Sequence, residues 1–262
     1  MRAPKSAAVF YYLGEVFLAS GDTSKATQFF TRALQFTGGA ALSAELKSVA
    51  YVRLGEMYSR KEMLQEASEA FSAAIRVNPL NHRAWRELGW SHFRLTRSVS
   101  SAEALILRAA KISTLPQYYI DLSDIHRLAG NFDRAFHYAK LARTSGAFGG
   151  SATARARIHF DRREFDLAVR ELRLAVSSGG QDFDTFFWLG RAYLALNDRP
   201  KCEEAFLEAL RFKTSPEVFL SMAELYTSEG RLSEARRILA RGLQAHPQNE
   251  DLLEMSNSIG QR

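Results

Sequence analysis

The chain has 262 residues, 46% hydrophobic and 24% charged, a composition of ordinary folded proteins rather than of disordered tails or membrane proteins. No stretch approaches the roughly 18 consecutive apolar residues of a membrane span, and the N-terminal residues fit no signal peptide, so we expect a cytoplasmic protein. The only cysteine, Cys202, excludes an internal disulfide and a cysteine-based metal site. The net charge of +6 comes mainly from arginine, which either makes contacts that lysine cannot make or reflects a genome rich in G and C.

The dipeptide Leu-Gly recurs along the chain with ring-bearing residues at fixed distances from it. It stands at Leu13-Gly14, Leu54-Gly55, Leu88-Gly89 and Leu189-Gly190. An aromatic residue lies three positions before each Leu, and an aromatic residue or a histidine lies three positions after each Gly. Residues at this spacing share one face of an α-helix. Each Leu-Gly therefore predicts a helix with one packed face.

A second pattern follows each Leu-Gly and consists of a small residue, a large residue four positions later and another small residue after three more. It is formed by Ala26, Phe30 and Ala33, by Ala67, Phe71 and Ala74, by Ala102, Ile106 and Ala109, and by Cys202, Phe206 and Ala209. Small side chains let two helices approach closely while the large one fills the space between them. The pattern predicts a second helix packed against the first. In one such helix, Ser100 and Glu103 have the spacing of an N-terminal capping box.

Together these motifs resemble the tetratricopeptide repeat, whose unit of roughly 34 residues carries W-x2-L-G-x2-Y and then A-x3-F. The resemblance covers residues 7–249 and implies an all-α fold, a tetratricopeptide-type α-solenoid in which antiparallel helix pairs form a right-handed superhelix. We expect a single solenoid domain, residues 1–262, that ends in a capping helix at 250–262. Residues 41–47 favour a helix, so they should lengthen the first helix of the second repeat. The repeats are expected at 7–40, 48–81, 82–115, 116–148, 149–182, 183–215 and 216–249.

The resemblance also implies where a ligand binds, because the first helices of this family line a concave groove. Residues of these helices that the motif does not use for packing are expected to face the groove. Trp90 and Trp188 stand out among them, whereas Trp85 fills a motif position and should be core. Aromatic residues and arginine often carry the binding energy of protein interfaces. The expected partner-binding residues are Tyr11, Tyr12, Arg53, Arg60, Arg83, Arg86, Trp90, Phe93, Arg94, Asp121, Asp124, Arg157, Phe160, Phe187, Trp188 and Arg191.

The arginines of the second and third repeats form a cluster, which predicts an acidic segment in the ligand. The alternative is a solvated face whose charge is balanced by Glu56 and Glu87. Asp121 and Asp124 would then attract a basic residue of the ligand or pair with nearby arginines, Arg127 and Arg157. Some relatives clamp the C-terminal carboxylate of a chaperone with Asn and basic residues. Glu15 and Arg53 occupy the Asn positions in this chain, so we do not expect that function.

Catalysis is not expected, because no nucleophile elbow, zinc-protease motif, phosphate-binding loop or dinucleotide-binding motif occurs. His92, His126 and His159 take the same repeat position. Helices packed roughly 8–10 Å apart cannot bring all three within about 2.1 Å of one zinc ion, so we expect them to replace the motif Tyr, half-buried between helices. Cys202 lies at a small core position, where a thiol is a poor nucleophile. We expect no cofactor, no metal and no small-molecule substrate.

The sequence therefore predicts a non-enzymatic scaffold or adaptor that binds an acidic or amphipathic segment of another protein. Single-stranded nucleic acid is an alternative ligand, since an arginine-lined groove with interleaved aromatic residues also fits it. Acidic residues interspersed along the same helices argue against nucleic acid. Self-assembly through the chain ends is a further alternative, because residues 250–262 provide a short cover for the last repeat.

Overall fold

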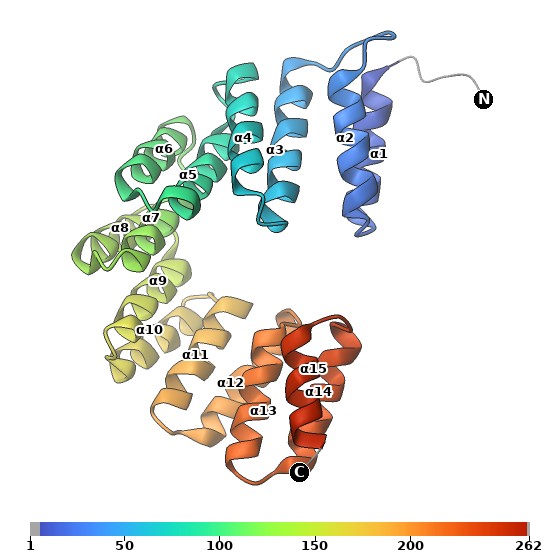
Figure 1. The fold of residues 1–262 in the computed structure, drawn as a ribbon. Coiled ribbons are helices and arrows are strands. Elements are labelled where there is room, and N and C mark those ends of the chain that lie inside the picture. Colours follow the sequence, from blue (N-terminus) through green and yellow to red (C-terminus); the bar gives the residue numbers. More distant parts are fainter. Residues whose placement is uncertain (1–5, 261–262) are drawn as a thin grey trace. The chain divides into compact units, whose positions relative to one another are not determined.

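The computed structural model describes residues 6–260, and this part of the chain consists of fifteen α-helices without a strand (Figure 1). The expected all-α solenoid of helix pairs is therefore confirmed. The last two residues of the expected capping helix lie outside the described residues.

Contacts divide the chain into two compact units, with the boundary between Asn131 and Phe132. This boundary falls inside the fourth expected repeat, and a single domain stays a prediction. Unit 1 contains α1 (Ala7–Ala19), α2 (Thr23–Gln35), α3 (Ala44–Arg60), α4 (Leu64–Val77), α5 (His82–Thr96), α6 (Val99–Ile112) and α7 (Gln117–Leu128). Unit 2 contains α8 (Phe132–Thr144), α9 (Phe148–Asp161), α10 (Phe165–Ser177), α11 (Phe183–Ala195), α12 (Arg199–Phe212), α13 (Pro216–Ser228), α14 (Leu232–Ala245) and α15 (Glu250–Gly260).

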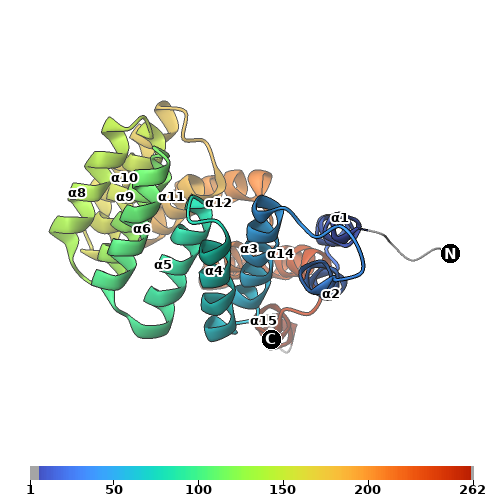
Figure 2. The ribbon, with the colours of Figure 1, turned by 90° about the horizontal axis from the view of Figure 1, so that it is seen from above.

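Helices that follow each other in the chain pack together within each unit (Figures 1 and 2). The pairs α1–α2, α3–α4 and α5–α6 form in unit 1, and the pairs α9–α10, α11–α12 and α13–α14 form in unit 2. Each pair then packs on the next helix along the chain. We call α1, α3, α5, α7, α9, α11 and α13 the first helices.

The glycine of each Leu-Gly explains how closely a pair can pack. A Cβ atom added at Gly55 would lie 2.5 Å from the ring of Phe71, and one at Gly190 would lie 2.5 Å from the ring of Phe206. Gly89 faces the smaller Ile106, at 2.7 Å. The large residue of the second pattern therefore occupies the space that a side chain on the first helix would need.

Helices α3 and α15 show how the sequence departs from the regular repeat. Helix α3 begins at Ala44, where the hydroxyl of Ser43 accepts a hydrogen bond from the backbone N–H of Leu46 (3.2 Å). Residues 44–47 thus lengthen this first helix, as expected from the sequence, whereas residues 41–43 are not helical because Ser43 caps the helix. Helix α15 buries Leu252 and Ile259 in the apolar core that α12, α13 and α14 form.

Candidate binding surfaces on the first helices

Three of the expected partner-binding residues are buried in unit 1 and are not available to a partner. Tyr11 is 7% exposed and Phe93 is 2% exposed, and both lie in the core. Asp121 is 3% exposed. Tyr11 and Val52 share one repeat position, two residues before the motif Leu, and both are buried. That position packs between neighbouring helices, because α1 and α3 also contact each other.

The expectation for Trp85 is also corrected, since this side chain is only half-buried. Its indole N–H donates a hydrogen bond to the backbone carbonyl of Pro79 (2.8 Å). The guanidinium of Arg108 lies 5.9 Å from its ring centroid. Trp85 therefore fixes the turn before α5 rather than filling the core.

Most arginines of the unit 1 cluster are already paired with the protein's own carboxylates. Arg53 bonds Glu15 through two contacts of 2.9 and 3.1 Å, and Arg83 pairs with Glu56. The remaining pairs join Arg86 to Asp121 and Glu87, Arg94 to Glu62, and Arg127 to Asp124. Of the arginines expected to bind acid in this cluster, only Arg60 has no carboxylate partner among residues 6–260. The structure thus favours the alternative of a charge-balanced face.

Burial distinguishes the pair of Arg86 and Asp121 from an ordinary surface ion pair. Burial by itself would lower the pKa of Arg86, but its two hydrogen bonds with Asp121 raise that pKa above its ordinary value. Burial also raises the pKa of the neighbouring Glu87, although Arg86 lies 2.7 Å from it. Removing one partner of such a pair leaves the other charge buried without a counter-charge, which destabilises the fold. Arg86 therefore links α5 to α7, and its guanidinium is not free to bind a ligand.

Trp90 borders a small polar hollow of unit 1. The hollow has a volume of about 320 Å³, and its lining includes Ser59 of α3 and Arg86, Trp90 and Arg94 of α5. Trp90 is half-buried, and its ring centroid lies 6.3 Å from that of Phe93. Tyr12 is 59% exposed. Trp90, Tyr12 and Arg60 are the residues of the expected unit 1 site that stay accessible without an acidic partner.

In unit 2, four expected residues gather into one group, which we call the Arg191 cluster: Phe160 of α9 and Phe187, Trp188 and Arg191 of α11. The guanidinium carbon of Arg191 lies 4.7 Å from the ring centroid of Trp188, 4.9 Å from that of Phe160 and 5.8 Å from that of Phe187. The rings of Phe160 and Trp188 meet at 73° with centroids 5.2 Å apart. All four side chains are half-buried. Such contacts combine aromatic packing with cation–π attraction.

Arg191 differs from its neighbour Arg157 in its charge partners. Arg157 also lies over Trp188, at 5.8 Å, but pairs with Asp184 (3.1 Å). Arg191 has no carboxylate within ion-pair distance in the described part of the chain. Its positive charge is therefore held against aromatic rings without being neutralised.

Two of the three histidines singled out from the sequence lie beside carboxylates, and the cysteine lies in the core. His126 is buried beside Glu103, with Nε2 and the carboxylate 3.4 Å apart, and His159 lies 2.7 Å from Glu164. No group of three or more His, Cys, Asp or Glu side chains suited to a metal ion occurs among residues 6–260. Cys202 is fully buried, which confirms its core position, and burial raises the pKa of its thiol to about 12. Over the same residues, no helix combines the length and the apolar character that crossing a membrane requires.

Several solved structures share this fold at low sequence identity. Yeast Tom70 superposes with a TM-score of 0.77 at 15% identity, over 97% of this chain and 53% of that chain. A tetratricopeptide repeat protein from Parabacteroides merdae gives 0.67 at 12% identity, over 98% of this chain and 99% of that one. The Cut9–Hcn1 hetero-tetramer of APC/C gives 0.59 at 18% identity, over 81% of this chain and only 42% of that chain. The chain therefore spans about half or less of Tom70 and of the matched Cut9–Hcn1 chain.

Sequence comparison gives a matching result at the level of the repeats. No curated protein matches the chain. Family models described as tetratricopeptide repeat match residues 53–115, 153–217 and 216–257, which is more than half of the chain. These segments contain Gly55, Gly89 and Gly190, three of the four Leu-Gly glycines. The chain belongs to the tetratricopeptide repeat family.

Proposed function

We propose that this chain is a non-enzymatic scaffold that binds a segment of a partner protein on its first helices, with the Arg191 cluster as the main contact. Proteins with this fold generally mediate protein–protein interactions and are typically scaffolds without catalytic activity. The single observation that carries the proposal is the cationic Arg191 held on three aromatic rings without an acidic partner.

The chemistry of Arg191 suits an acidic residue of the partner. A guanidinium has five N–H donors in a planar fork that matches a carboxylate. Stacking on Phe160, Phe187 and Trp188 restricts the rotamers of Arg191 before a ligand arrives, so less conformational entropy is lost on binding. The half-buried rings add the apolar contact area that typifies interface hot spots. We therefore expect the bound segment to carry Asp or Glu beside an apolar residue.

Unit 1 is less suited to an acidic ligand. A carboxylate of the partner would have to compete with Glu15, Glu56 and Asp121 for arginines that they already hold. The same pairing weakens the case for nucleic acid, because phosphates need uncompensated cations. We expect unit 1 to contribute through Trp90 and Tyr12 instead.

The proposal is tested by affinity capture with the full chain as bait in an extract of the source cells, followed by calorimetric titration of the purified partner. Trp188→Ala and Arg191→Glu are each expected to weaken binding by about 2 kcal/mol or more, as hot-spot residues do. Arg191→Lys should recover only part of the affinity, since lysine keeps the charge but not the planar stacking. Arg170→Glu, an equal charge change at an exposed site on α10, is the matched control.

Circular dichroism on every variant separates lost binding from lost folding. Arg86→Glu is unsuitable as a test, because it would place a second carboxylate beside the buried Asp121 and destabilise unit 1. Equal affinity of wild type, Trp188→Ala and Arg191→Glu for the captured partner would rule out the Arg191 cluster as the binding site.

A further inference from the structure

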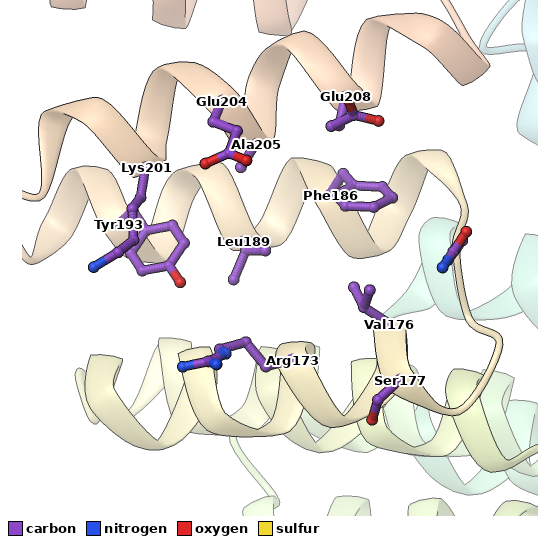
Figure 3. Close-up of a pocket in the computed structure, with 11 residues that line it drawn as sticks. Arg173, Val176, Ser177, Phe186, Leu189, Tyr193, Lys201, Glu204, Ala205 and Glu208 are labelled. Atoms are coloured by element: carbon purple, nitrogen blue, oxygen red, sulfur yellow. The ribbon is translucent and has the colours of Figure 1, made fainter.

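Unit 2 contains a second hollow that lies among α10, α11 and α12 (Figure 3). Its volume is about 600 Å³, which is within the range of roughly 300–1,000 Å³ found for ligand pockets. Phe186 and Leu189 of α11 and Ala205 of α12 give it an apolar floor. Leu189 and Ala205 are 8% and 3% exposed. We call this hollow the α10–α12 pocket.

The α10–α12 pocket lies on the side of α11 opposite the Arg191 cluster. Successive residues of an α-helix are turned by about 100°. Phe186, Leu189 and Tyr193, which line the pocket, therefore share one side of α11. Phe187, Trp188 and Arg191 share the other side, so the two sets of residues lie on different surfaces of α11.

Charged side chains surround the apolar floor, and the two signs are arranged along the pocket. Figure 3 shows Arg173 of α10 and Lys201 of α12 at the end where Tyr193 lies, and Glu208 at the end where Phe186 lies, with Glu204 between them. Lys201 lies 5.5 Å from the Tyr193 ring centroid. The basic side chains thus lie toward one end of the pocket, and Glu208 lies toward the other.

Two of these charges have no partner of opposite sign. Lys201 bonds Asp198 (2.6 Å) and Glu208 bonds Arg211 (2.9 Å). Arg173 and Glu204 form no ion pair with any residue in the range 6–260. Both are exposed, and each can take up an opposite charge from a ligand without breaking a bond of the protein.

We propose that the α10–α12 pocket binds an extended segment of a partner protein that places a carboxylate at Arg173, an apolar side chain over Leu189 and Ala205, and a basic group at Glu204. Phe186 and Tyr193 are seven residues apart on α11, which corresponds to about 10 Å along the helix. About three extended residues span that distance. The proposal goes beyond the first-helix scaffold function and does not rest on it, because the residues are different and lie on the other side of α11.

The test is a nuclear magnetic resonance titration of the isotope-labelled full chain with an acetylated peptide, Gly-Glu-Phe-Lys-Gly. The backbone amides of Val176, Leu189 and Ala205 are expected to shift, while the indole N–H of Trp188 stays in place. A peptide with Gln in place of Glu should bind roughly tenfold more weakly, as expected for a lost hydrogen bond to a charged group. A peptide with Ala in place of Phe should also bind more weakly, because it lacks the apolar contact.

Variants of the protein assign the contact. Arg173→Glu should abolish the preference for the Glu peptide over the Gln peptide. Arg170→Glu, the same change one turn earlier on α10 and outside the pocket lining, should keep that preference.

Three results would overturn the proposal: no shift of the pocket amides at millimolar peptide, equal affinity of the Glu and Gln peptides, or an unchanged preference in Arg173→Glu. Shifts confined to Trp188 and Phe160 would also overturn it, and they would assign the peptide to the Arg191 cluster instead. If the partner titration ruled out the Arg191 cluster as a binding site, the peptide titration of the α10–α12 pocket would keep its expected outcome.

Discussion

At the scale of single residues, the missing side chain of a motif glycine decides how closely two helices pack. Gly55→Ala would place a methyl group 2.5 Å from the ring of Phe71. Helix propensity favours Ala over Gly by about 1 kcal/mol, whereas overpacking a core costs about 1–3 kcal/mol. Because Phe71 is itself buried against its neighbours, we expect overpacking to outweigh helix propensity and the free energy of unfolding to fall by up to about 2 kcal/mol in urea titrations.

Gly38→Ala provides the control for this substitution. A Cβ atom there would lie 3.4 Å from Phe36, in the loop after α2, so no repacking is needed. We expect its unfolding midpoint to stay near that of the wild type. A Gly55→Ala protein as stable as the Gly38→Ala protein would show that the pair α3–α4 can separate without cost.

A second prediction at this scale concerns Glu234 and acid stability. Arg231 contacts Glu203, Glu229 and Glu234 at 2.9–3.0 Å. Hydrogen bonds from Ser233 and then from Arg231 lower the pKa of Glu234 from 4.5 to about 2. A lowered pKa means that this carboxylate adds stability above pH 4.5, and that the contribution is lost as the pH falls from 4.5 to about 2.

Glu234→Gln should therefore flatten the fall of the thermal unfolding midpoint across that pH window, as followed by circular dichroism. Glu204→Gln, at an exposed glutamate without an ion pair within residues 6–260, should retain the wild-type slope. Identical slopes for wild type and Glu234→Gln would contradict a specific role of this carboxylate.

The sequence predicted which positions of a helix pack against its own partner, but not which ones pack against the following pairs. The packing of Phe71 and Phe206 against motif glycines follows from spacing alone. The burial of Tyr11 and Phe93 does not, because a helical wheel describes one helix and says nothing of a third helix that covers its flank. Likewise, Arg86 finds Asp121 35 positions further along the chain, a contact that only the packed array creates.

At the scale of helices and turns, the same backbone conformation recurs where the two helices of a pair meet. Gly21 and Gly230 have positive φ in two of these turns, and Gly130 has it after α7. Glu62, Arg97, Arg163 and Asn197 have φ of 56–62° in four others. Non-glycine residues pay a steric penalty in this region, so the turn geometry is imposed by the packed helices rather than by local preference.

We therefore expect Arg163→Gly to stabilise the protein. Arg163 has φ of 62° and is exposed. Relief of the left-handed strain is worth about 1–2 kcal/mol, and the extra flexibility of glycine in the unfolded chain removes about half of it. The expected gain of about 0.5–1 kcal/mol is measurable by urea unfolding.

Gly230→Ala makes the reverse change at the equivalent turn. Its φ is 73° and no atom lies within 4 Å of the added Cβ, so only backbone strain can act. Its stability should fall. If both substitutions moved stability in the same direction, backbone strain would not be the cause.

The C-terminal helix α15 offers two adjacent leucines with opposite environments. Leu252 is fully buried, whereas Leu253 is 41% exposed. Leu252→Ala should lower the free energy of unfolding of unit 2 by about 2–5 kcal/mol, as a core cavity does. Leu253→Ala should lower it by less than about 1 kcal/mol. Equal losses in calorimetric unfolding would mean that α15 does not cover the last pair.

Helix existence was predictable because each first and second helix carries its own spacing of small and large residues. Helix ends were less predictable. The capping box expected at Ser100 is absent, because α6 begins at Val99 and Ser98 accepts the capping hydrogen bond from Ser101. Neighbouring serines make equally good caps in sequence, so the spacing alone does not identify the one that is used. The α10–α12 pocket has no sequence signal at all, since it arises where three helices meet.

At the scale of the whole molecule, contacts between helices that follow each other in the chain dominate within each unit. The core of α12 to α15 is one cluster, and the core of α1 to α4 is another. Stability in such an array is approximately a sum of repeat terms and nearest-neighbour terms. A destabilising substitution at one end should therefore increase local unfolding mainly in the helices next to it.

Hydrogen exchange followed by mass spectrometry tests this locality with the Leu252→Ala variant. Loss of the buried side chain removes part of the core that α13 and α14 share with α15, so amide exchange should accelerate most in these three helices. Acceleration should be smaller in α11 and α12 and absent in α1 to α4, whose core contains no residue of that cluster. The Leu253→Ala protein should exchange like the wild type throughout. A uniform acceleration of all helices in Leu252→Ala would instead mean that both units unfold in one cooperative step, because only global opening changes every amide by the same free energy.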